Sequence, residues 1–505
     1  MQEELIEKIR SRVFKTEDYI NSVLTLGINK TWEALISYLE EVGIDTFSET
    51  VIDFFDIGRL YEIGLAIDDK YIKKDSGQYY TPNDVAHLMA SFLVEGNRLT
   101  NLYDIGCGCG NLTIEVLKTI KNRSETEFEN LLNNIFLFEI DKTALAICLA
   151  RISCYFRIPK SSIKVATNDF LSKNATLHKR DLFIIANPPY SKITAIEEEW
   201  EYKSCILESK DLYVGFLEKI ILHAKKAVIV TPQSYIVGKN FSKLRALLFQ
   251  EGSGEIYTFD NVPGTLFNGK KEGIFNTNCS NGVRASILVF KHDSELIHGY
   301  RMTHLIRFKN EERKTVLTPE YLKSLLGTRK QDLLKPLKCP VDLEGFVYNI
   351  SKNSTGCLRN LISKNKNGFP IYINSSARYF IVATKAPMKR KGIYIFYAKD
   401  EVAFYLLYAL LNSSYCYLWW RMMDGGILIP QKLLMDIPIP DIRLDRNLKS
   451  VIDEMIRSES KYLVYKKNAG ALQESVKFPH FYREKINNLL FGDIDFTRIH
   501  KNSEG

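Results

Sequence analysis

A glycine-rich segment in the first half of the chain has residue types suited to binding a nucleotide-like ligand. In segment 104–110, Asp104 ends an apolar run and is followed by three alternating glycines, Gly106, Gly108 and Gly110. Glycines let the backbone approach a ligand closely where a strand turns into a helix. Similar turns bind dinucleotides and some bind nothing, so this segment by itself predicts only the general kind of ligand.

Two cysteines in the same turn, Cys107 and Cys109, raise the question of a metal site. They are separated by one residue, and no second pair follows at metal-ligand spacing. We therefore interpret them as small residues in a tight turn and predict no metal. The nine cysteines of the chain are scattered, which is typical of reduced thiols in a cytosolic protein.

Two further carboxylates follow the next two apolar runs. Glu139 can accept both ribose hydroxyls of an adenosine, and Asp169 can bind the adenine amino group while Phe170 packs on the ring. Each acid alone is more simply a helix cap or a loop residue. Three acids at successive strand ends favour an adenosine site. The candidate contacts are Asp104, Gly106, Gly108, Glu139, Ile140, Asp169 and Phe170.

The most specific motif is the tetrapeptide Asn187-Pro188-Pro189-Tyr190, which ends a strongly apolar run. A tetrapeptide of this kind after such a strand resembles that of amino-methyltransferases that depend on S-adenosylmethionine. The resemblance implies S-adenosylmethionine as the cofactor and methyl transfer to an amino group. The alternative is a turn stiffened by two prolines, which the three preceding sites make less favoured.

The residue types of the tetrapeptide suit methylation of adenine. The adenine amine is a poor nucleophile because its lone pair is delocalised into the ring. If the Asn187 side-chain oxygen and the Pro188 carbonyl accept its two hydrogens, the nitrogen pyramidalises and its lone pair turns toward the methyl group. The prolines fix the carbonyl direction, and positioning with electrostatics supplies most of the effect. We expect Asn187, Pro188 and Tyr190 to be catalytic.

A base inside a duplex cannot reach such a pocket, so it must be flipped out and held by stacking. Tyr190 supplies one aromatic face. In the family that the chain resembles, a second aromatic residue in a later loop closes the other face. Segment 261–267 lies where that loop would be, which makes Phe267 the candidate. Packing of Phe267 in the loop's own core is the alternative.

Segment 77–82, upstream of the glycine-rich turn, resembles a motif of gamma-class N6-adenine DNA methyltransferases. The resemblance implies that this segment packs over the methionine end of the cofactor and that Pro82 starts a helix. We expect Tyr80, Thr81 and Asn187 to bind the cofactor. In this class the cofactor site precedes the tetrapeptide and a target-recognition region follows it, as here. The later run 411–440 resembles the C-terminal specificity domains of restriction-modification enzymes.

The elements that must position these residues alternate between strands and helices. The predicted strands are 102–107, 135–141, 163–170, 181–190, 227–232 and 285–291. The predicted helices are 111–121, 142–156, 211–225 and 239–250. This alternation predicts an α/β fold with a doubly wound, Rossmann-like sheet, in which ligands bind at the carboxyl ends of the strands.

We expect four regions along the chain. Residues 1–74 have apolar positions at helical spacing and predict an N-terminal helical region, followed by the methyltransferase domain over 75–300. Aromatic and basic strand-like runs predict an α+β target-recognition domain over 301–447, with one helix at 402–423. Residues 448–505 are predicted as a helical tail.

Charge is unevenly distributed and favours a polyanionic partner. The chain has a net charge of +8, but residues 301–450 hold 25 Lys and Arg against 12 Asp and Glu. This surplus favours double-stranded DNA, although solvated lysines on an ordinary surface are the alternative. Candidate phosphate contacts are Lys385, Lys389, Arg390 and Lys391, with Arg378 nearby. No apolar run reaches the roughly 20 residues of a membrane span, and the charged first residues lack the apolar core of a signal peptide, so we expect a cytoplasmic protein.

The sequence therefore predicts a site-specific DNA adenine N6-methyltransferase of a restriction-modification system. We expect it to act as a monomer on DNA, with any cognate endonuclease as a separate protein. The alternatives are a partner-dependent modification subunit of a larger restriction or defence complex, and methylation of N4-cytosine, of RNA adenine or of a protein glutamine.

Overall fold

A computed structural model of the chain divides it into two compact units. Unit 1 comprises Met1–Arg301, Ile306–Ser324 and Arg329–Pro336, and unit 2 comprises Met302–Leu305, Leu325–Thr328 and Leu337–Gly505. The structure describes residues 2–12, 14–51, 57–68, 80–177, 181–267, 283–292, 299–329, 331, 333, 337–365, 367–377, 379–426, 428–468 and 471–500.

Unit 1 is built on an eight-stranded sheet in the order β3-β2-β1-β4-β5-β7-β6-β8. The strands are β1 (Leu102–Ile105), β2 (Ile135–Phe138), β3 (Lys164–Ala166), β4 (Leu182–Ala186), β5 (Ala224–Pro232), β6 (Gly252–Thr258), β7 (Ala285–His292) and β8 (Gly299–Met302). The first five in this order are parallel, and β7 is antiparallel to both β5 and β6. All five residues of β4 are buried, as expected for a strand covered on both faces.

The carboxyl ends of four parallel strands meet at one edge of the sheet. Ile105, the last residue of β1, is paired with Phe138 and Ala186, and Phe138 is paired with Ala166. The segments that follow β1, β2, β3 and β4 therefore begin side by side. This register brings together motifs that are widely separated in the sequence.

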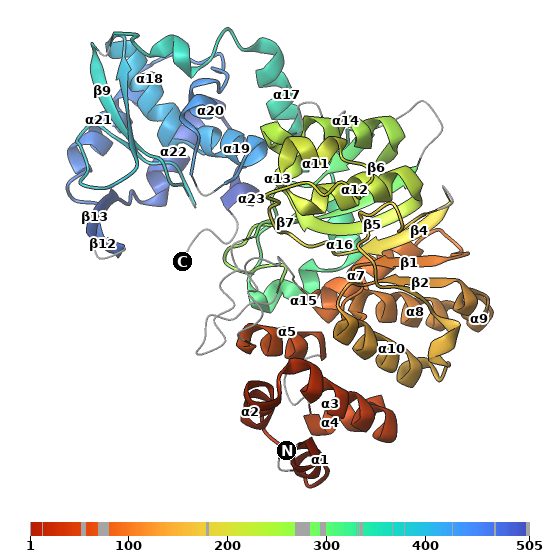
Figure 1. The fold of residues 1–505 in the computed structure, drawn as a ribbon. Helices are drawn as coiled ribbons and strands as arrows, with labels where there is room; N and C mark the ends of the chain where they lie inside the picture. The colour runs from red at the N-terminus through yellow and green to blue at the C-terminus, as the bar shows by residue number, and fades with distance from the viewer. Residues whose placement is uncertain are drawn as a thin grey trace. The chain divides into compact units, whose positions relative to one another are not determined.

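Helices cover both faces of this sheet (Figure 1). One layer contains α7 (Asn83–Val94), α8 (Asn111–Arg123) and α10 (Lys142–Phe156), and the other contains α11 (Ser204–Ser209), α12 (Leu212–His223) and α14 (Ser242–Glu251). Further short elements of unit 1 are α9 (Glu125–Leu131), α13 (Ser234–Val237), α15 (Arg313–Val316) and α16 (Pro319–Ser324). The predicted doubly wound α/β fold is confirmed.

Strands β6 and β8 were not among the strands predicted from the sequence. Strand β6 contains Gly252 and Gly254, at which a Cβ atom would lie 2.1 Å from the Lys291 carbonyl oxygen and 2.0 Å from that of Val289. Glycine is therefore needed for close backbone approach, while it lowers the strand propensity of the segment.

The N-terminal helices belong to unit 1. They are α1 (Gln2–Arg10), α2 (Thr16–Leu26), α3 (Ile28–Val42), α4 (Ile44–Val51) and α5 (Ile57–Ile67). Their core is centred on Trp32, whose indole nitrogen donates to the Tyr19 hydroxyl at 3.1 Å, and it extends to Ala144 and Ile147 of α10. The Tyr61 hydroxyl donates to Asp141 at 2.6 Å, and Asp141 follows Glu139 by two residues in the chain. The N-terminal helices thus pack directly against α10 of the sheet's helical layer.

Unit 2 combines helices with a three-stranded antiparallel sheet in the order β10-β9-β11. The strands are β9 (Phe369–Asn374), β10 (Ala383–Thr384) and β11 (Ile393–Ala398). The helices are α17 (Glu344–Asn353), α18 (Glu401–Asn412), α19 (Ser414–Met423), α20 (Gln431–Met435), α21 (Arg446–Ser458), α22 (His480–Phe491) and α23 (Thr497–His500). The region is α+β, as predicted.

Two details of unit 2 differ from the sequence prediction. The helix expected over 402–423 is divided at Ser413, which caps α19 by accepting a hydrogen bond from the Tyr415 amide. The tail expected to be helical over 448–505 contains a hairpin of β12 (Leu463–Asn468) and β13 (Ala471–Val476). Its apolar residues share one core with those of 339–437, because the amphipathic α21 packs against α18.

The part of the chain that the structure describes contains neither a candidate membrane span nor a candidate metal site. No helix there combines the length and the apolar character that a membrane span requires. In the same residues, no three or more side chains of His, Cys, Asp and Glu are grouped so that they could hold a metal ion.

Candidate active site

A cavity of about 250 Å³ opens at the carboxyl edge of the parallel strands in unit 1. Its lining includes the predicted cofactor residues Tyr80, Thr81, Gly106, Gly108, Glu139, Ile140, Asp169, Phe170 and Asn187. It also includes residues that the sequence analysis did not select: Cys107, Cys109, Asn111, Leu112, Phe138, Asn168, Pro189, Trp200, Leu212 and Phe216. The structure thus brings the separate motifs together around one space.

The glycine-rich turn and Glu139 are joined by a hydrogen bond from a backbone amide of the turn to the Glu139 carboxylate. The Gly108 amide donates to Glu139 Oε2 at 2.8 Å, and the Asp141 amide donates to Oε1 at 3.0 Å. Gly108 has φ +51°, and a Cβ atom there would lie 2.9 Å from the Tyr80 ring. Glycine is therefore required by both conformation and space. Burial raises the pKa of Glu139, which lies at the tip of β2.

Asp104 lies in the protein interior next to this turn and does not line the cavity. Its side chain is fully buried, and Oδ2 accepts hydrogen bonds from the Thr113 hydroxyl at 2.6 Å and the Thr113 amide at 3.2 Å. Burial raises the pKa of Asp104 to about 7, against the opposing effect of the Thr113 hydrogen bonds. The geometry gives Asp104 a positioning role, tying β1 to α8, in place of the direct contact expected from the sequence.

Asp169 and Phe170 lie at the end of the cavity that follows β3. Asp169 Oδ1 accepts the Leu171 amide at 2.9 Å, and Oδ2 accepts the indole N–H of Trp200 at 2.7 Å. The Phe170 ring packs edge-on against Phe138, with ring centroids 5.4 Å apart. Trp200 comes from the segment after the tetrapeptide and lines the cavity. No motif marks it in the sequence, because only the fold places it against Asp169.

The Asn187 side chain is held by the upstream motif. Its Nδ2 donates to the Thr81 hydroxyl oxygen at 3.0 Å. The Thr81 carbonyl accepts from Asn111 Nδ2 at 2.8 Å, and Asn111 Oδ1 in turn accepts from buried Arg151 at 2.6 Å. Because Nδ2 of Asn187 is directed at Thr81, its Oδ1 is left as the acceptor. The Asn111–Arg151 pair was not predicted, because its two members come from different helices.

Tyr190 and Phe267, the two rings predicted to flank the target base, are in contact with each other. Their ring centroids are 6.0 Å apart with an interplanar angle of 66°. The Tyr190 hydroxyl donates to Asn187 Oδ1 at 2.9 Å and also lies 3.2 Å from the Val230 carbonyl oxygen. Phe267 is buried. In this arrangement the rings pack edge to face, so a base could stack on them only after the rings move apart.

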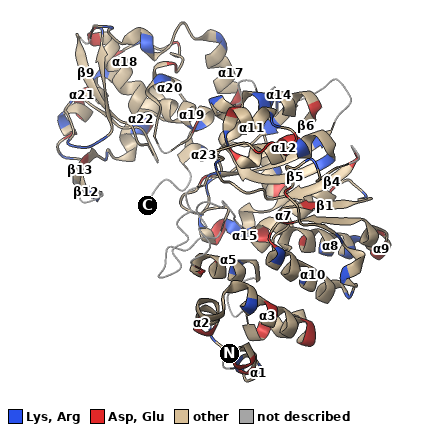
Figure 2. Cartoon of the chain, in the orientation of Figure 1, with Lys and Arg blue, Asp and Glu red and all other residues tan. Residues whose placement is uncertain are grey.

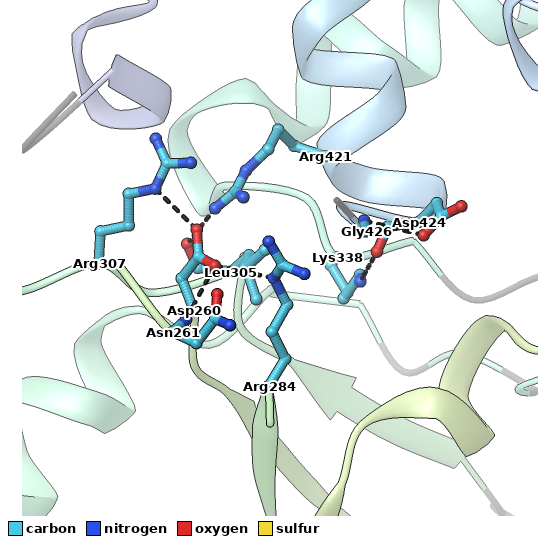
Figure 3. A network of polar contacts seen from close by, with 9 residues as sticks. All are labelled: Asp260, Asn261, Arg284, Leu305, Arg307, Lys338, Arg421, Asp424 and Gly426. Atoms are coloured by element: carbon cyan, nitrogen blue, oxygen red, sulfur yellow. Dashed lines mark hydrogen bonds and ion pairs between the residues drawn. The ribbon is translucent and has the colours of Figure 1, made fainter. Parts of the chain in front are cut away.

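The loop 261–267 that carries Phe267 starts from a buried carboxylate. Asp260 lies between Arg284 and Arg307, with N–O distances of 2.8 Å to each (Figure 3). The Asp260 amide donates to the Ile306 carbonyl at 2.8 Å, and the Gly264 amide donates to the Phe308 carbonyl at 2.9 Å. Ile306, Arg307 and Phe308 thus hold this loop, and its last residue, Phe267, contacts Tyr190.

In unit 2, the basic loop 385–391 is fixed by two carboxylates. Glu459, which is buried, accepts the amides of Lys385 and Ala386 at 2.7 and 2.9 Å, and Glu474 accepts the Lys389 amide at 2.8 Å. The side chains of Lys385, Lys389 and Lys391 are exposed. Lys and Arg number 25 against 16 Asp and Glu over residues 337–505, and Figure 2 shows their positions.

Of the other two basic residues expected to contact phosphate, Arg390 is among the described residues. Arg390 is half-buried and donates to the Ser376 hydroxyl at 3.1 Å. Arg378 lies outside the described residues.

A family model described as N-6 DNA Methylase matches residues 52–331. This match spans more than half of the chain and includes the cavity and the loop that carries Phe267. The chain belongs to the N-6 DNA methylase family. The resemblance inferred from the tetrapeptide is thereby confirmed at the level of the family, while its assignment to the gamma class stays a prediction.

Curated relatives of the chain come from restriction-modification systems. The chain is 24% identical over 185 residues to the methylase subunit of the type I restriction enzyme MpnII from Mycoplasma pneumoniae, which is 35% of this chain and 32% of that protein. It is 28% identical over 236 residues to the type II methyltransferase M.BanIII from Aneurinibacillus aneurinilyticus, 41% of this chain and 39% of that protein. The chain therefore spans between about a third and two fifths of these relatives.

Among solved structures, the chain is similar to the methyltransferase subunit of a type I restriction-modification system from Streptococcus thermophilus. The identity is 17%, the match covers 64% of this chain and 73% of that chain, and the TM-score is 0.38.

Proposed function

We propose that this chain transfers a methyl group from S-adenosylmethionine to the N6 amine of adenine in double-stranded DNA. The observation that carries the proposal is the orientation of Asn187. Its Nδ2 is held 3.0 Å from the Thr81 hydroxyl, so its Oδ1 is the accepting atom of the amide, and this oxygen binds the Tyr190 hydroxyl beside the cavity. An acceptor at this position suits an amine with two hydrogens to donate.

The cavity fits S-adenosylmethionine by the chemistry of its lining. Carboxylates at the tips of β2 and β3, Glu139 and Asp169, suit the ribose hydroxyls and the adenine amine, and Phe138 and Phe170 supply apolar surface. Gly106 and Gly108, both at positive φ, leave the backbone open at the start of α8. In this proposal, Tyr80 and Thr81, which also line the cavity, hold the methionine end. The cofactor supplies a methyl group activated by a positively charged sulfur.

Asn187 and Pro188 direct the amine in this proposal. Asn187 Oδ1 and the Pro188 carbonyl accept its two hydrogens, which turns the nitrogen lone pair toward the methyl group. The Tyr190 hydroxyl now donates to Asn187 Oδ1, but the Val230 carbonyl lies within reach at 3.2 Å. Rotation of that hydroxyl to Val230 frees Asn187 for the amine without leaving a buried donor unpaired.

The target adenine has to leave the duplex to reach this site. We propose that it stacks between Tyr190 and Phe267 once their edge-to-face contact opens. We also propose that the exposed lysines of the loop 385–391 bind DNA phosphates. Glu459 and Glu474 hold that loop in one conformation, so a phosphate contact costs less ordering entropy than it would in a free loop.

The chain's place in a restriction-modification system is a further part of the proposal. We propose that it is the modification enzyme, acting as a monomer on DNA beside a separate cognate endonuclease. The relative from Mycoplasma pneumoniae is described as a subunit, which favours one alternative, a modification subunit that needs a partner. Isolated activity separates the two.

The proposal is tested by following the methyl group. The purified chain and its Asn187→Ala variant are each incubated with tritiated S-adenosylmethionine and unmethylated double-stranded DNA, and the labelled nucleoside is identified after digestion. We expect label in N6-methyladenine and a loss on the order of 1000-fold in the variant, since removing a single oriented acceptor has effects of this size. Label in N4-methylcytosine, in RNA or in protein would contradict the proposed substrate.

A further inference from the structure

Arg313 connects two parts of unit 1 that lie far apart in the sequence. It is buried and begins the short helix α15. Its guanidinium forms a bidentate ion pair with Asp84, in which Nη2 lies 2.9 Å from Oδ1 and Nε contacts Oδ2. The partner carboxylate sits in the first turn of α7, which begins immediately after Thr81 and Pro82.

The same guanidinium also binds the loop that carries Phe267. Nη1 donates to the Thr265 carbonyl and Nη2 to the Leu266 carbonyl, each at 2.7 Å. These are the two residues that precede Phe267, whose ring contacts Tyr190. Arg313 therefore fixes the backbone next to the candidate stacking ring at two points.

The first turn of α7 thus reaches both sides of the target-base site. Thr81, just before the helix, holds the amide of Asn187 at 3.0 Å. Asp84, three residues later, holds Arg313 and through it the loop. We propose that Asp84 and Arg313 form a clamp that positions Phe267 relative to Asn187. The N-terminal end of α7 then positions both the Asn187 amide and the Phe267 ring. This inference rests on the proposed function, because it assigns Phe267 to the target base.

Arginine suits this position for a geometric reason. Its planar guanidinium has N–H donors in several fixed directions, so it can donate to a carboxylate and to two carbonyls at once. A lysine ammonium is a compact charge that cannot reach all three acceptors in this geometry. The side chain of Arg313 is 9% exposed and that of Asp84 is 42% exposed, so the guanidinium is the buried member of the pair. Arg313 is a positioning residue, since it contacts neither the cavity lining nor the tetrapeptide in the described contacts.

The clamp is tested first without any DNA. Hydrogen–deuterium exchange is measured on the full chain and on Arg313→Gln and Arg313→Lys variants, following peptides that cover residues 259–267. We expect exchange in this loop to rise at least about tenfold in Arg313→Gln and by less in Arg313→Lys, because the lysine keeps one contact to Asp84. Unchanged exchange of the loop in Arg313→Gln would overturn the clamp, whether or not the chain methylates DNA.

The control variant is Arg123→Gln, at the end of α8, where Arg123 contacts the opposite end of α7. Arg123 donates to the Val94 carbonyl at 3.0 Å and pairs with Glu127, so it also joins an arginine, a carbonyl and a carboxylate. We expect loop exchange in this variant to equal that of the wild-type chain. An equal rise in both variants would assign the effect to general destabilisation of α7 and overturn the clamp.

The second measurement separates positioning from stability. With plasmid DNA and S-adenosylmethionine, we expect kcat of Arg313→Gln to fall on the order of 100-fold, as for misplacement of a reacting group by about 1 Å. The KM for S-adenosylmethionine should stay within about twofold, because the cofactor contacts are untouched. A parallel rise in that KM would contradict the assignment of Arg313 to the target side. A wild-type chain that is inactive on DNA would contradict the proposed function and leave the exchange result as the test of the clamp.

Discussion

The two halves of the candidate site are held together by different kinds of contact. We call the part proposed to bind S-adenosylmethionine the cofactor half and the part proposed to hold the target base the target half. In the cofactor half, carboxylates at strand ends accept hydrogen bonds from backbone amides: Glu139 accepts from Gly108 and Asp141, and Asp169 accepts from Leu171, at 2.8 to 3.0 Å. In the target half, arginine side chains hold a loop: Arg313 binds two loop carbonyls, and Arg284 and Arg307 bind Asp260 at its base.

Because of this difference, we expect the two halves to keep their shape in different ways. Backbone amides at the ends of parallel strands are fixed by the sheet, so the cofactor half keeps its shape as long as the sheet is folded. The target loop depends on the long side chains of Arg284, Arg307 and Arg313, so it can lose its position while the sheet stays intact. Substitutions in the two halves should therefore affect different measurable quantities.

The largest expected effect is on cofactor affinity in the variant Glu139→Ala. This substitution removes the acceptor of the Gly108 amide and the carboxylate proposed to bind the ribose hydroxyls. The dissociation constant for S-adenosylmethionine should rise about 100-fold, as expected for hydrogen bonds to a charged group. Isothermal titration calorimetry measures it, with Glu129→Ala, an exposed acid of the same unit, as the control. An affinity equal to that of the control would show that Glu139 does not bind the cofactor.

A smaller effect is expected in the target half from Phe267→Ala. Loss of one stacking face should lower kcat/KM for DNA about tenfold, since stacking of a base on an aromatic ring is worth roughly 1–3 kcal/mol. Phe267→Tyr keeps the ring and should stay close to wild type. The affinity for S-adenosylmethionine should be unchanged in both variants. A fall in cofactor affinity after Phe267→Ala would contradict the division of the site into two halves.

The last effect is on stability and not on binding or catalysis, and it concerns Asp104, which supports the cofactor half. Burial raises the pKa of Asp104 to about 7 in the folded chain, from an ordinary value of 3.8. The unfolded chain therefore loses this proton at lower pH, and the stability contributed by the protonated carboxyl is present below pH 3.8 and is lost as the pH rises toward 7.

Asp104→Asn removes this loss, because the amide does not ionise. The free energy of unfolding of the variant, relative to wild type, should increase with pH by up to about 1.4 kcal/mol per unit between the two pKa values. Urea unfolding at pH 5 and pH 7 measures the difference. A constant difference at the two pH values would be inconsistent with a neutral Asp104 in the fold.

The cofactor half could be predicted from the sequence because its residues follow apolar runs and its turn needs glycine. Glu139 and Asp169 are recognisable by their position after strands, and the tetrapeptide by its residue types. Trp200 and Arg313 could not be predicted. Each meets its partner through the tertiary fold, Arg313 across 229 positions from Asp84, and nothing in the local pattern marks such a pairing.

The limits of prediction are similar in the fold. The alternation of strands and helices predicted the sheet, since buried strands and amphipathic helices have distinct periods. Strand β6 was missed because its glycines serve close backbone approach, which lowers the local strand signal. The hairpin β12–β13 was missed because its sequence includes polar residues with low strand propensity, such as Lys467 and Glu474, and α21 before it set the expectation of a helical tail.

The central claim is that this chain methylates adenine in DNA, and one measurement tests it directly. The chain is expressed alone in a host that lacks DNA methyltransferases, and the genomic DNA is analysed by mass spectrometry and by sequencing that detects modified bases. The account predicts N6-methyladenine at one recurring sequence, absent when Asn187→Ala is expressed instead. Genomic DNA without N6-methyladenine, from cells in which the folded chain binds S-adenosylmethionine, would contradict it.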